Sequence, residues 1–135
     1  MDAKRQRLLE ILKRESYVPG RVRLASGRES DFYIDIRKSA FLPEAAVLIG
    51  DVLGARLASL DIDAVGGMAV GAIPLVDAVV HARARGEAPL PGFFVRKATK
   101  GHGLGKRVEG RFKKGDRVAI LEDVVTTGES SLQAA

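Results

Sequence analysis

Short apolar runs alternate with longer helix-like stretches through the second half of this 135-residue sequence. The pattern predicts strands at 63–70, 92–96 and 117–123, and helices at about 74–85 and after Gly128. Strands that alternate with helices are typical of a parallel sheet with helices packed against its faces. The sequence therefore predicts an α/β fold with a doubly wound parallel sheet.

The first forty residues lack this alternation. An apolar stripe among Lys and Arg predicts a helix over 3–14, and turn and strand signals follow over 20–37. A second helix is predicted from 43 to about 58, because Pro is favoured in the first turn of a helix. We therefore divide the chain into an N-terminal segment, 1–40, and a core, 41–135.

Composition excludes several kinds of protein. A hydrophobic content of 46% in 135 residues supports the core of one domain, and the absence of Cys excludes disulfides and thiolate metal sites. No apolar run approaches the ~20 residues that span a bilayer, so we expect a cytoplasmic protein without a membrane partner. The net charge of +5 is concentrated in 96–117, where no series of aromatic side chains accompanies it. Nucleic-acid binding by base stacking is therefore unlikely.

Two acidic residues follow the last predicted strand. The unbroken apolar run Val118–Leu121 is typical of a central parallel strand, and Glu122 and Asp123 come directly after it. In open α/β sheets, ligands bind beyond the carboxyl ends of the strands. An isolated acidic pair is more often a solvated strand end, but the residues that come next favour a binding site here.

The segment after the acidic pair is rich in hydroxyl groups. It contains Thr126, Thr127, Gly128, Glu129, Ser130 and Ser131. Hydroxyls and backbone N–H groups can hold a phosphate, and a glycine lets the main chain approach it closely. Two acids would repel that phosphate, so we expect them to hold the vicinal hydroxyls of a ribose, or a Mg²⁺ that a polyphosphate brings. No Gly-Lys-Ser/Thr sequence closes the segment, which disfavours a P-loop.

A basic, glycine-rich stretch precedes the last strand. We expect residues 97–110 to form a flexible loop, whose cations, together with Arg96, suit a polyphosphate. Lys97, Lys100 and His102 are its candidate functional residues. Composition alone fits a solvated basic loop equally well. His102 lies among glycines rather than on an apolar face, which favours a functional role for it.

Three ordered segments resemble motifs of the orotate phosphoribosyltransferases, which are type I phosphoribosyltransferases. Residues 26–35 resemble the N-terminal signature, 96–103 the flexible catalytic loop, and 119–131 the motif that binds phosphoribosyl pyrophosphate (PRPP). The resemblance covers almost the whole chain and implies a type I phosphoribosyltransferase-like sheet with a small N-terminal hood. The family's orotate-binding arginine would lie beyond Ala135, and the last helix has scarcely begun there. We therefore expect a C-terminally incomplete core.

The resemblance implies a reaction and a role for each motif. The family transfers the phosphoribosyl group of PRPP to orotate, with Mg²⁺, giving orotidine 5′-monophosphate and pyrophosphate for UMP biosynthesis. Lys100, His102 and Asp123 would be catalytic. Arg96 and Lys97 would bind the pyrophosphate, Glu122 the ribose hydroxyls, and residues 126–130 the 5′-phosphate. The family also implies a homodimer in which the basic loop reaches the neighbouring subunit's site.

Further contacts are implied in two other segments. Phe32 and Tyr33 could line the wall against which the pyrimidine packs, although ordinary packing of the hood explains them slightly better. Lys38 could reach a phosphate or the orotate carboxylate, and Thr126 resembles a family contact to orotate. The stretch 66–74 resembles the pyrophosphate loop, but it is an equally good strand-to-helix turn. Some relatives carry a lysine there, where this chain has Gly71, and another where it has Ala25.

Two alternatives to this function stay open. One is another type I phosphoribosyltransferase, acting on a purine or uracil, which the motifs at 96–103 and 26–35 disfavour. The other is a non-catalytic regulator that senses PRPP or binds RNA. A regulator would have no need of Lys100 and His102, so the basic loop distinguishes the two.

Overall fold

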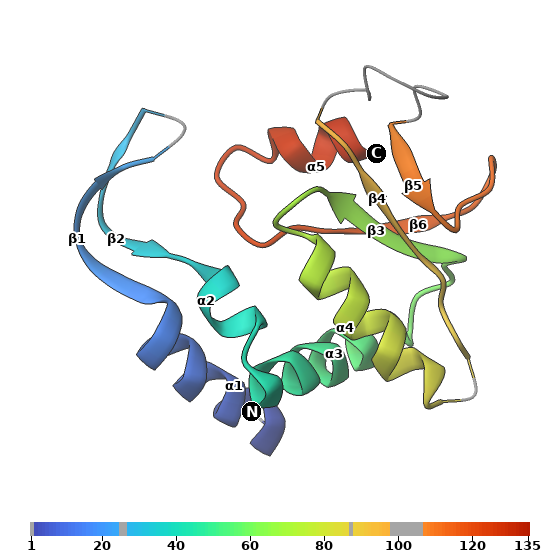
Figure 1. Cartoon of the computed structure of the whole chain (residues 1–135), viewed down its shortest axis with the longest axis horizontal. Helices are drawn as coiled ribbons and strands as arrows, with labels where there is room; N and C mark the ends of the chain where they lie inside the picture. The colour runs from blue at the N-terminus through green and yellow to red at the C-terminus, as the bar shows by residue number, and fades with distance from the viewer. Residues whose placement is uncertain (1, 25–26, 87, 98–106) are drawn as a thin grey trace.

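A computed structural model of the chain describes residues 2–24, 27–86, 88–97 and 107–135 (Figure 1). The chain begins with α1 (Ala3–Ile11), which continues into one π-helical turn, η1 (Leu12–Ser16). Asp2 caps α1, since its Oδ1 accepts a hydrogen bond of 2.9 Å from the backbone N–H of Arg5. The predicted helix over 3–14 is therefore present and continues for two further residues, to Ser16.

An antiparallel hairpin follows, made of β1 (Tyr17–Arg23) and β2 (Glu29–Ile34). Figure 1 shows the hairpin projecting from the end of this helical segment, apart from the sheet of the core. Its base is fixed by two hydrogen bonds. The Asp35 N–H donates to the Ser16 carbonyl at 2.9 Å, and the buried hydroxyls of Ser16 and Ser39 lie 2.5 Å apart. The hairpin is thus fastened to the next helix, α2 (Ile36–Ala40).

The core contains a four-stranded sheet with the order β5-β4-β3-β6. Its strands are β3 (Ala64–Met68), β4 (Gly92–Val95), β5 (Val108–Gly110) and β6 (Val118–Leu121). β3 pairs in parallel with both β4 and β6, as the alternating pattern predicted. β5 pairs antiparallel with β4. The predicted loop over 97–110 therefore includes a strand at its end, which could not be seen in the sequence because basic residues and glycines surround a run of only three residues.

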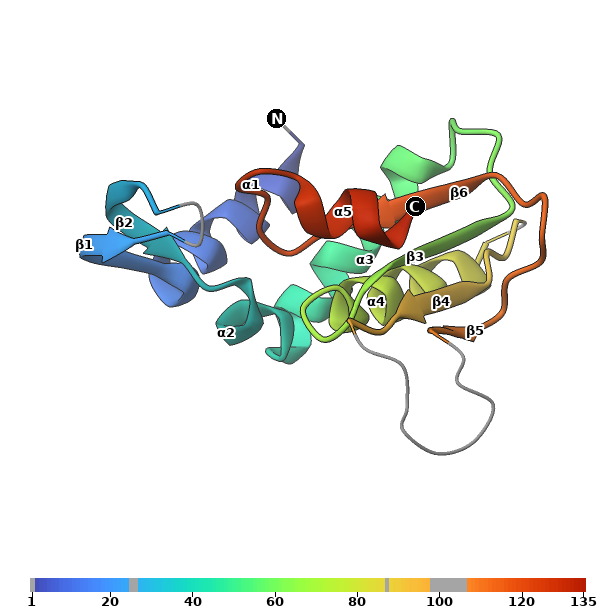
Figure 2. The same cartoon turned by 90° about the horizontal axis from the view of Figure 1, so that it is seen from above.

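Helices cover both faces of this sheet (Figure 2). α3 (Pro43–Leu57) and α4 (Ile73–Ala84) lie on one face, where Leu57, Val76 and Val79 pack with Val65 of β3. α5 (Glu129–Ala134) lies on the other face, where its Ala134 packs beside a cluster formed by Ala64, Met68, Phe93 and Val95. The predicted doubly wound arrangement is confirmed. In the described part of the chain, no helix has the length and apolar character needed to cross a membrane.

α3 and α4 pack closely because α3 carries glycines at the crossing. A β-carbon at Gly50 would collide with the Ala78 carbonyl oxygen and would lie 3.2 Å from the Ala82 β-carbon. At Gly54 the nearest atoms would be 3.6 Å away, which is ordinary contact. A further apolar cluster joins α1 to this helix pair through Leu8 and Ile11.

The position of β6 differs from the prediction of a central strand. Among the described strands β6 lies at the edge of the sheet, with β3 as its neighbour, and its four residues are half-buried. The apolar pattern of Val118–Leu121 indicates which residues prefer burial. It carries no information on how many strands pair beside them. The predicted parallel strand itself is confirmed.

Candidate functional site

Three predicted site segments follow parallel strands and so meet at one edge of the sheet. Gly71 lies beyond β3, Arg96 and Lys97 follow β4, and Glu122 and Asp123 follow β6. Neighbouring strands are about 4.8 Å apart, so the ends of β4 and β6 are separated by about 10 Å across β3. This edge is where ligands bind in open α/β sheets.

The Glu122 carboxylate lies in an unfavourable setting for a charge. Partial burial raises the pKa of Glu122 above its ordinary value, and the adjacent Asp123 carboxylate raises it further. The Ser131 hydroxyl donates to Glu122 Oε2 at 3.4 Å and opposes the shift. A group that offers donors or positive charge to both carboxylates would therefore be bound favourably at this strand end.

The Asp123 carboxylate also contacts the loop beyond β3. A β-carbon built at Gly71 would lie 2.5 to 2.6 Å from the carboxylate carbon and both carboxylate oxygens of Asp123. The Gly71 position thus has no room for a side chain while Asp123 keeps its place. The stretch 66–74 and the acidic pair, which lie far apart in the sequence, form one site.

The hydroxyl-rich turn leads from β6 into α5. It encloses a hollow of about 30 Å³, lined by Glu122 and residues 124–130, which is too small for a heterocyclic ring. Gly128 has a φ of +79°, a left-handed conformation that favours glycine, and nothing lies within 4 Å of its missing β-carbon. Thr127 Oγ1 accepts a hydrogen bond of 3.4 Å from the Glu129 N–H. Thr126, Thr127 and Glu129 are exposed, and Ser130 is half-buried.

The stem of the basic loop is held together by Arg96. Its Nε donates to Glu109 Oε1 at 2.8 Å, and its guanidinium carbon lies 5.6 Å from the centre of the Phe94 ring. The Arg96 N–H also donates to the Arg107 carbonyl at 2.8 Å. Lys97 is exposed beside it. The predicted residues Lys100 and His102 lie outside the described residues.

The hood residues lie on β2 and α2. Phe32 stacks on Tyr17 of β1, with ring centres 5.7 Å apart, which supports a packing role for this aromatic side chain. Tyr33 is half-buried and Lys38 is exposed. The substrate contacts of Phe32, Tyr33 and Lys38 stay predictions.

Arg37 is a candidate that the sequence analysis missed. Its Nε donates to Asp35 Oδ1 at 2.9 Å, and this partner raises the pKa of Arg37, with smaller contributions from Tyr33 and Asp123. Arg37 is therefore close enough to the acidic pair to interact with it electrostatically. The available signal was its place two residues after the 26–35 segment, beside Lys38, which was considered.

The side chains at the acidic pair limit which metal ion this site can bind without other ligands. Over the described residues there is no group of three or more His, Cys, Asp or Glu side chains that could bind an ion. Two neighbouring carboxylates fit a hard cation that keeps most of its water or phosphate ligands, as Mg²⁺ does.

Comparison with known proteins gives one consistent family. No family model matches the sequence. An orotate phosphoribosyltransferase of Streptomyces avermitilis is 48% identical over 134 residues, which are 99% of this chain and 74% of that protein. A crystal structure of Mycobacterium tuberculosis orotate phosphoribosyltransferase with Fe(III) dicitrate is 41% identical, with a TM-score of 0.80 over 97% of this chain and 73% of that one.

A second structure of the mycobacterial protein is in complex with PRPP. It is 37% identical to this chain, with a TM-score of 0.76, and the match covers 97% of this chain and 71% of that one. The chain thus spans nearly three quarters of the length of the relatives it matches.

Proposed function

Since this chain belongs to the orotate phosphoribosyltransferase family, we propose that Glu122, Asp123 and the turn after them hold PRPP while its phosphoribosyl group is transferred to orotate. The products are orotidine 5′-monophosphate and pyrophosphate, and the enzyme is a glycosyltransferase. The observation that carries the proposal is the acidic pair at the carboxyl end of β6, followed directly by a hydroxyl-rich turn. The names of the relatives disfavour a purine or uracil substrate.

The acidic pair would act on the sugar. Ribose hydroxyls can donate hydrogen bonds to Glu122 and Asp123, which relieves the repulsion that raises the pKa of Glu122. The anomeric carbon becomes cationic as the pyrophosphate leaves, and a nearby carboxylate stabilises that charge. Asp123 is fixed against Gly71 and is the better placed of the two for this role. The 5′-phosphate would bind the hydroxyls and N–H groups of residues 126–130.

The basic loop would act on the leaving group. Arg96, Lys97 and Lys100 would attract the pyrophosphate, and His102 would donate a hydrogen bond or a proton to one of its oxygens. Arg96 is pre-positioned by its ion pair with Glu109. Mg²⁺, brought by the polyphosphate and held mainly by it, would neutralise further charge there. Because Gly71 offers no cation, this loop carries more of the binding than in relatives with a lysine.

The base would bind between the hood and the core. Thr126 would contact orotate, Phe32 and Tyr33 would border its ring, and Lys38 would bind its carboxylate or a phosphate. Arg37 adds a second cation on the hood side, coupled to Asp123. Pyrimidine synthesis, a cytoplasmic location and a homodimer that shares the basic loop are parts of the same proposal, supported by the family of the relatives.

Calorimetry and an orotate assay test this function. PRPP with Mg²⁺ should bind, and orotate absorbance should fall on mixing all three with the protein. Lys100→Ala should abolish turnover while leaving PRPP binding largely intact, because the lysine acts on the departing pyrophosphate. Tight RNA binding without turnover would instead favour the regulator, and no affinity for PRPP would refute the assignment.

A further inference from the structure

Asp35 and Arg37 form an ion pair where the hood joins α2. Arg37 Nε donates a hydrogen bond of 2.9 Å to Asp35 Oδ1. The Asp35 side chain is 19% exposed, whereas the Arg37 side chain is 57% exposed. Asp35 is therefore the largely covered partner, and Arg37 is the partner that extends into solvent.

The carboxylate of Asp35 is not used in the way that its position suggests. An aspartate directly before a helix ordinarily caps it, as Asp2 does for α1. Asp35 directly precedes α2, but its side chain makes no capping hydrogen bond. The Arg37 side chain is the main cause of the lowered pKa of Asp35, burial opposes it, and the Arg37 backbone N–H contributes less. The Asp35 carboxylate thus holds the guanidinium.

The backbone of Asp35 is fixed on both sides. Its N–H donates to the Ser16 carbonyl at 2.9 Å, and its carbonyl accepts a hydrogen bond of 3.2 Å from the Lys38 N–H. The hydroxyl of Ser16 is in turn bonded to that of Ser39. A carboxylate on a fixed backbone restricts where the guanidinium of Arg37 can lie. Ordering a long side chain in the free protein lowers the entropy that it loses on binding a ligand.

Arg37 still has hydrogen-bond donors to offer. A guanidinium donates from Nε and from both Nη atoms, and the pair with Asp35 uses Nε. Within the part of the chain that the structure describes, the Nη atoms of Arg37 have no hydrogen-bond partner. These planar donors match the paired oxygens of a carboxylate or a phosphate.

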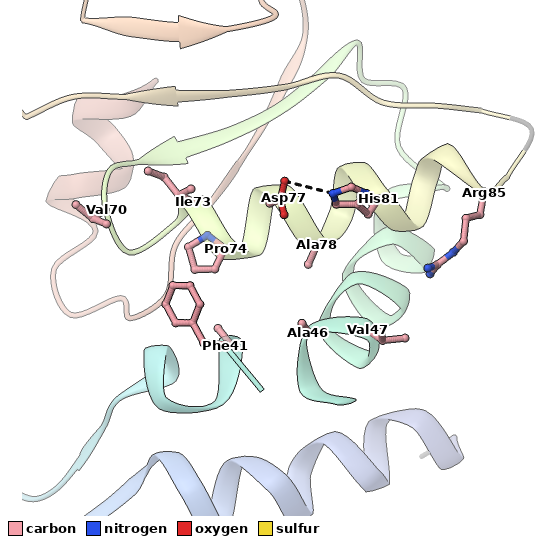
Figure 3. A pocket seen from close by; sticks show the side chains of 11 residues that line it. Phe41, Ala46, Val47, Val70, Ile73, Pro74, Asp77, Ala78, His81 and Arg85 are labelled. Carbon is pink, nitrogen blue, oxygen red and sulfur yellow. Dashed lines mark ion pairs between the residues drawn. The ribbon is translucent and has the colours of Figure 1, made fainter. Parts of the chain in front are cut away.

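α2 lies beside the loop that meets the acidic pair. Phe41, which follows α2, and Val70, in the loop after β3, line one hollow of about 580 Å³. Figure 3 shows the Phe41 ring directed toward Pro74 in the first turn of α4. Gly71, against which the Asp123 carboxylate lies, belongs to the same loop. The hood end of α2 and the acidic pair therefore border one site.

We propose that the Nη atoms of Arg37 bind an anionic group of the substrate, and that Asp35 is a positioning residue that holds Arg37 for this task. This inference rests on the proposed function, in which Tyr33 borders the base and Asp123 faces the sugar. A cation between them is placed near the junction of base and sugar.

The carboxylate of orotate fits this place better than a phosphate does. It is attached to the ring carbon next to the nitrogen that joins the sugar, so it lies close to the bond that forms. The phosphates of PRPP offer the same paired oxygens, but the proposed function gives them to residues 126–130 and to the basic loop. Arg37 would accordingly favour an acidic pyrimidine over a neutral one.

Two product nucleotides distinguish the sources of the anion without turnover. Orotidine 5′-monophosphate and uridine 5′-monophosphate differ only in the carboxylate. In calorimetry, Arg37→Ala should weaken binding of orotidine 5′-monophosphate about tenfold or more and leave that of uridine 5′-monophosphate unchanged. Weaker binding of both nucleotides, or of PRPP with Mg²⁺, would show that Arg37 binds an anion but that this anion is a phosphate.

Arg14→Ala is the matched control for Arg37→Ala. The Arg14 side chain is 60% exposed and pairs with the carboxylate of its neighbour Glu15 at 2.6 Å. Arg14 thus has the same charge, a similar exposure and an equally local partner, but it belongs to η1. Its replacement should leave the affinity for all three ligands unchanged. Equal melting temperatures would show that both variants fold.

A double-mutant cycle tests the role of Asp35. Asp35→Ala should weaken binding of the same ligand about twofold to tenfold, because Arg37 must then be ordered on binding. The variant that lacks both side chains should bind like Arg37→Ala alone, since Asp35 acts through Arg37. Arg37→Lys, which keeps the charge without the planar donors, should restore part of the affinity. Losses that add in the double variant would overturn the positioning role.

Unchanged affinity for all three ligands in Arg37→Ala would overturn the inference as a whole. If the original chain also converts orotate and PRPP, that result would refute the role of Arg37 and leave the proposed function standing. An original chain that binds neither PRPP nor either nucleotide would refute the proposed function and, with it, this role.

Discussion

The Asp123 carboxylate lies in the space that a side chain at position 71 would occupy, within 2.5 to 2.6 Å of where the β-carbon would be. The two residues come from different strands, β6 and β3, which pair in parallel. In this chain the acid takes up the volume of a side chain at position 71. Adding a lysine here would therefore displace the acid as well as supply a cation.

Gly71→Ala should lower PRPP affinity about tenfold and turnover by up to about 100-fold, since a displacement of about 1 Å has costs of that order. Gly86→Ala is the matched control, because a β-carbon there would meet only the Arg83 carbonyl oxygen, at 3.7 Å. Calorimetry measures the PRPP affinity, the orotate assay measures turnover, and melting temperatures check that both variants fold. Equal PRPP binding by the two variants would show that Gly71 does not position Asp123.

Glu122→Gln should stabilise the free protein at neutral pH and weaken PRPP binding. Burial and Asp123 raise the pKa of Glu122, so the folded state favours its neutral form and its ionisation costs stability. That cost is present above the raised pKa and disappears as the pH falls through it toward the ordinary value of 4.5. Urea unfolding from pH 7 to pH 4 should give a gain of up to about 1 kcal/mol that vanishes in acid.

Asp51→Asn should destabilise the protein by about 1 kcal/mol at pH 7. The Asp51 carboxylate joins α1 and the end of α4 to α3, with Lys4 Nζ at 2.7 Å and Arg85 Nη2 at 2.9 Å. Lys4 and then Arg85 lower the pKa of Asp51. The contribution is therefore complete above the ordinary value of 3.8 and is lost as the pH falls through the lowered pKa. Thermal unfolding of both proteins from pH 7 to pH 2 measures it, and a difference that persists in acid would contradict the ion-pair explanation.

The two glycines of α3 should respond in opposite directions to alanine. Gly50→Ala should cost about 1–3 kcal/mol, because its β-carbon would press on the Ala78 carbonyl of α4. Gly54→Ala should be neutral or stabilising by up to about 1 kcal/mol, since it has room and alanine favours the helix. Chemical denaturation compares them. Similar losses in both variants would mean that the helix crossing is not close at Gly50.

Local patterns predicted most of the fold because they depend on neighbouring residues only. The apolar run Val118–Leu121 followed by Glu122 indicates a strand end with an acid on it, whatever else the sheet contains. The alternation of strand and helix then places the ends of parallel strands at one edge. The acidic pair and the segment after β3 could be assigned to one site on these grounds.

Contacts between distant segments could not be predicted in this way. The fit of Asp123 onto Gly71 depends on how β3 and β6 are paired, and the coupling of Arg37 to Asp123 depends on where the hood lies. The edge position of β6 and the presence of β5 likewise depend on neighbours in space. None of these features can be predicted from the spacing of residues along the chain.

The buried hydrogen bond between the hydroxyls of Ser16 and Ser39 determines how the hairpin is attached to the rest of the protein. Together with the hydrogen bond from the Asp35 N–H to the Ser16 carbonyl, these hydroxyls hold the base of the β1–β2 hairpin in place. Most residues of the two strands are exposed to solvent. The hairpin is therefore anchored to the helical segments at its base. Phe32 and Tyr33 pair with Pro19 and Val18, close to that base, so the two serine hydroxyls help to fix the place of the side chains that the proposed function sets beside orotate.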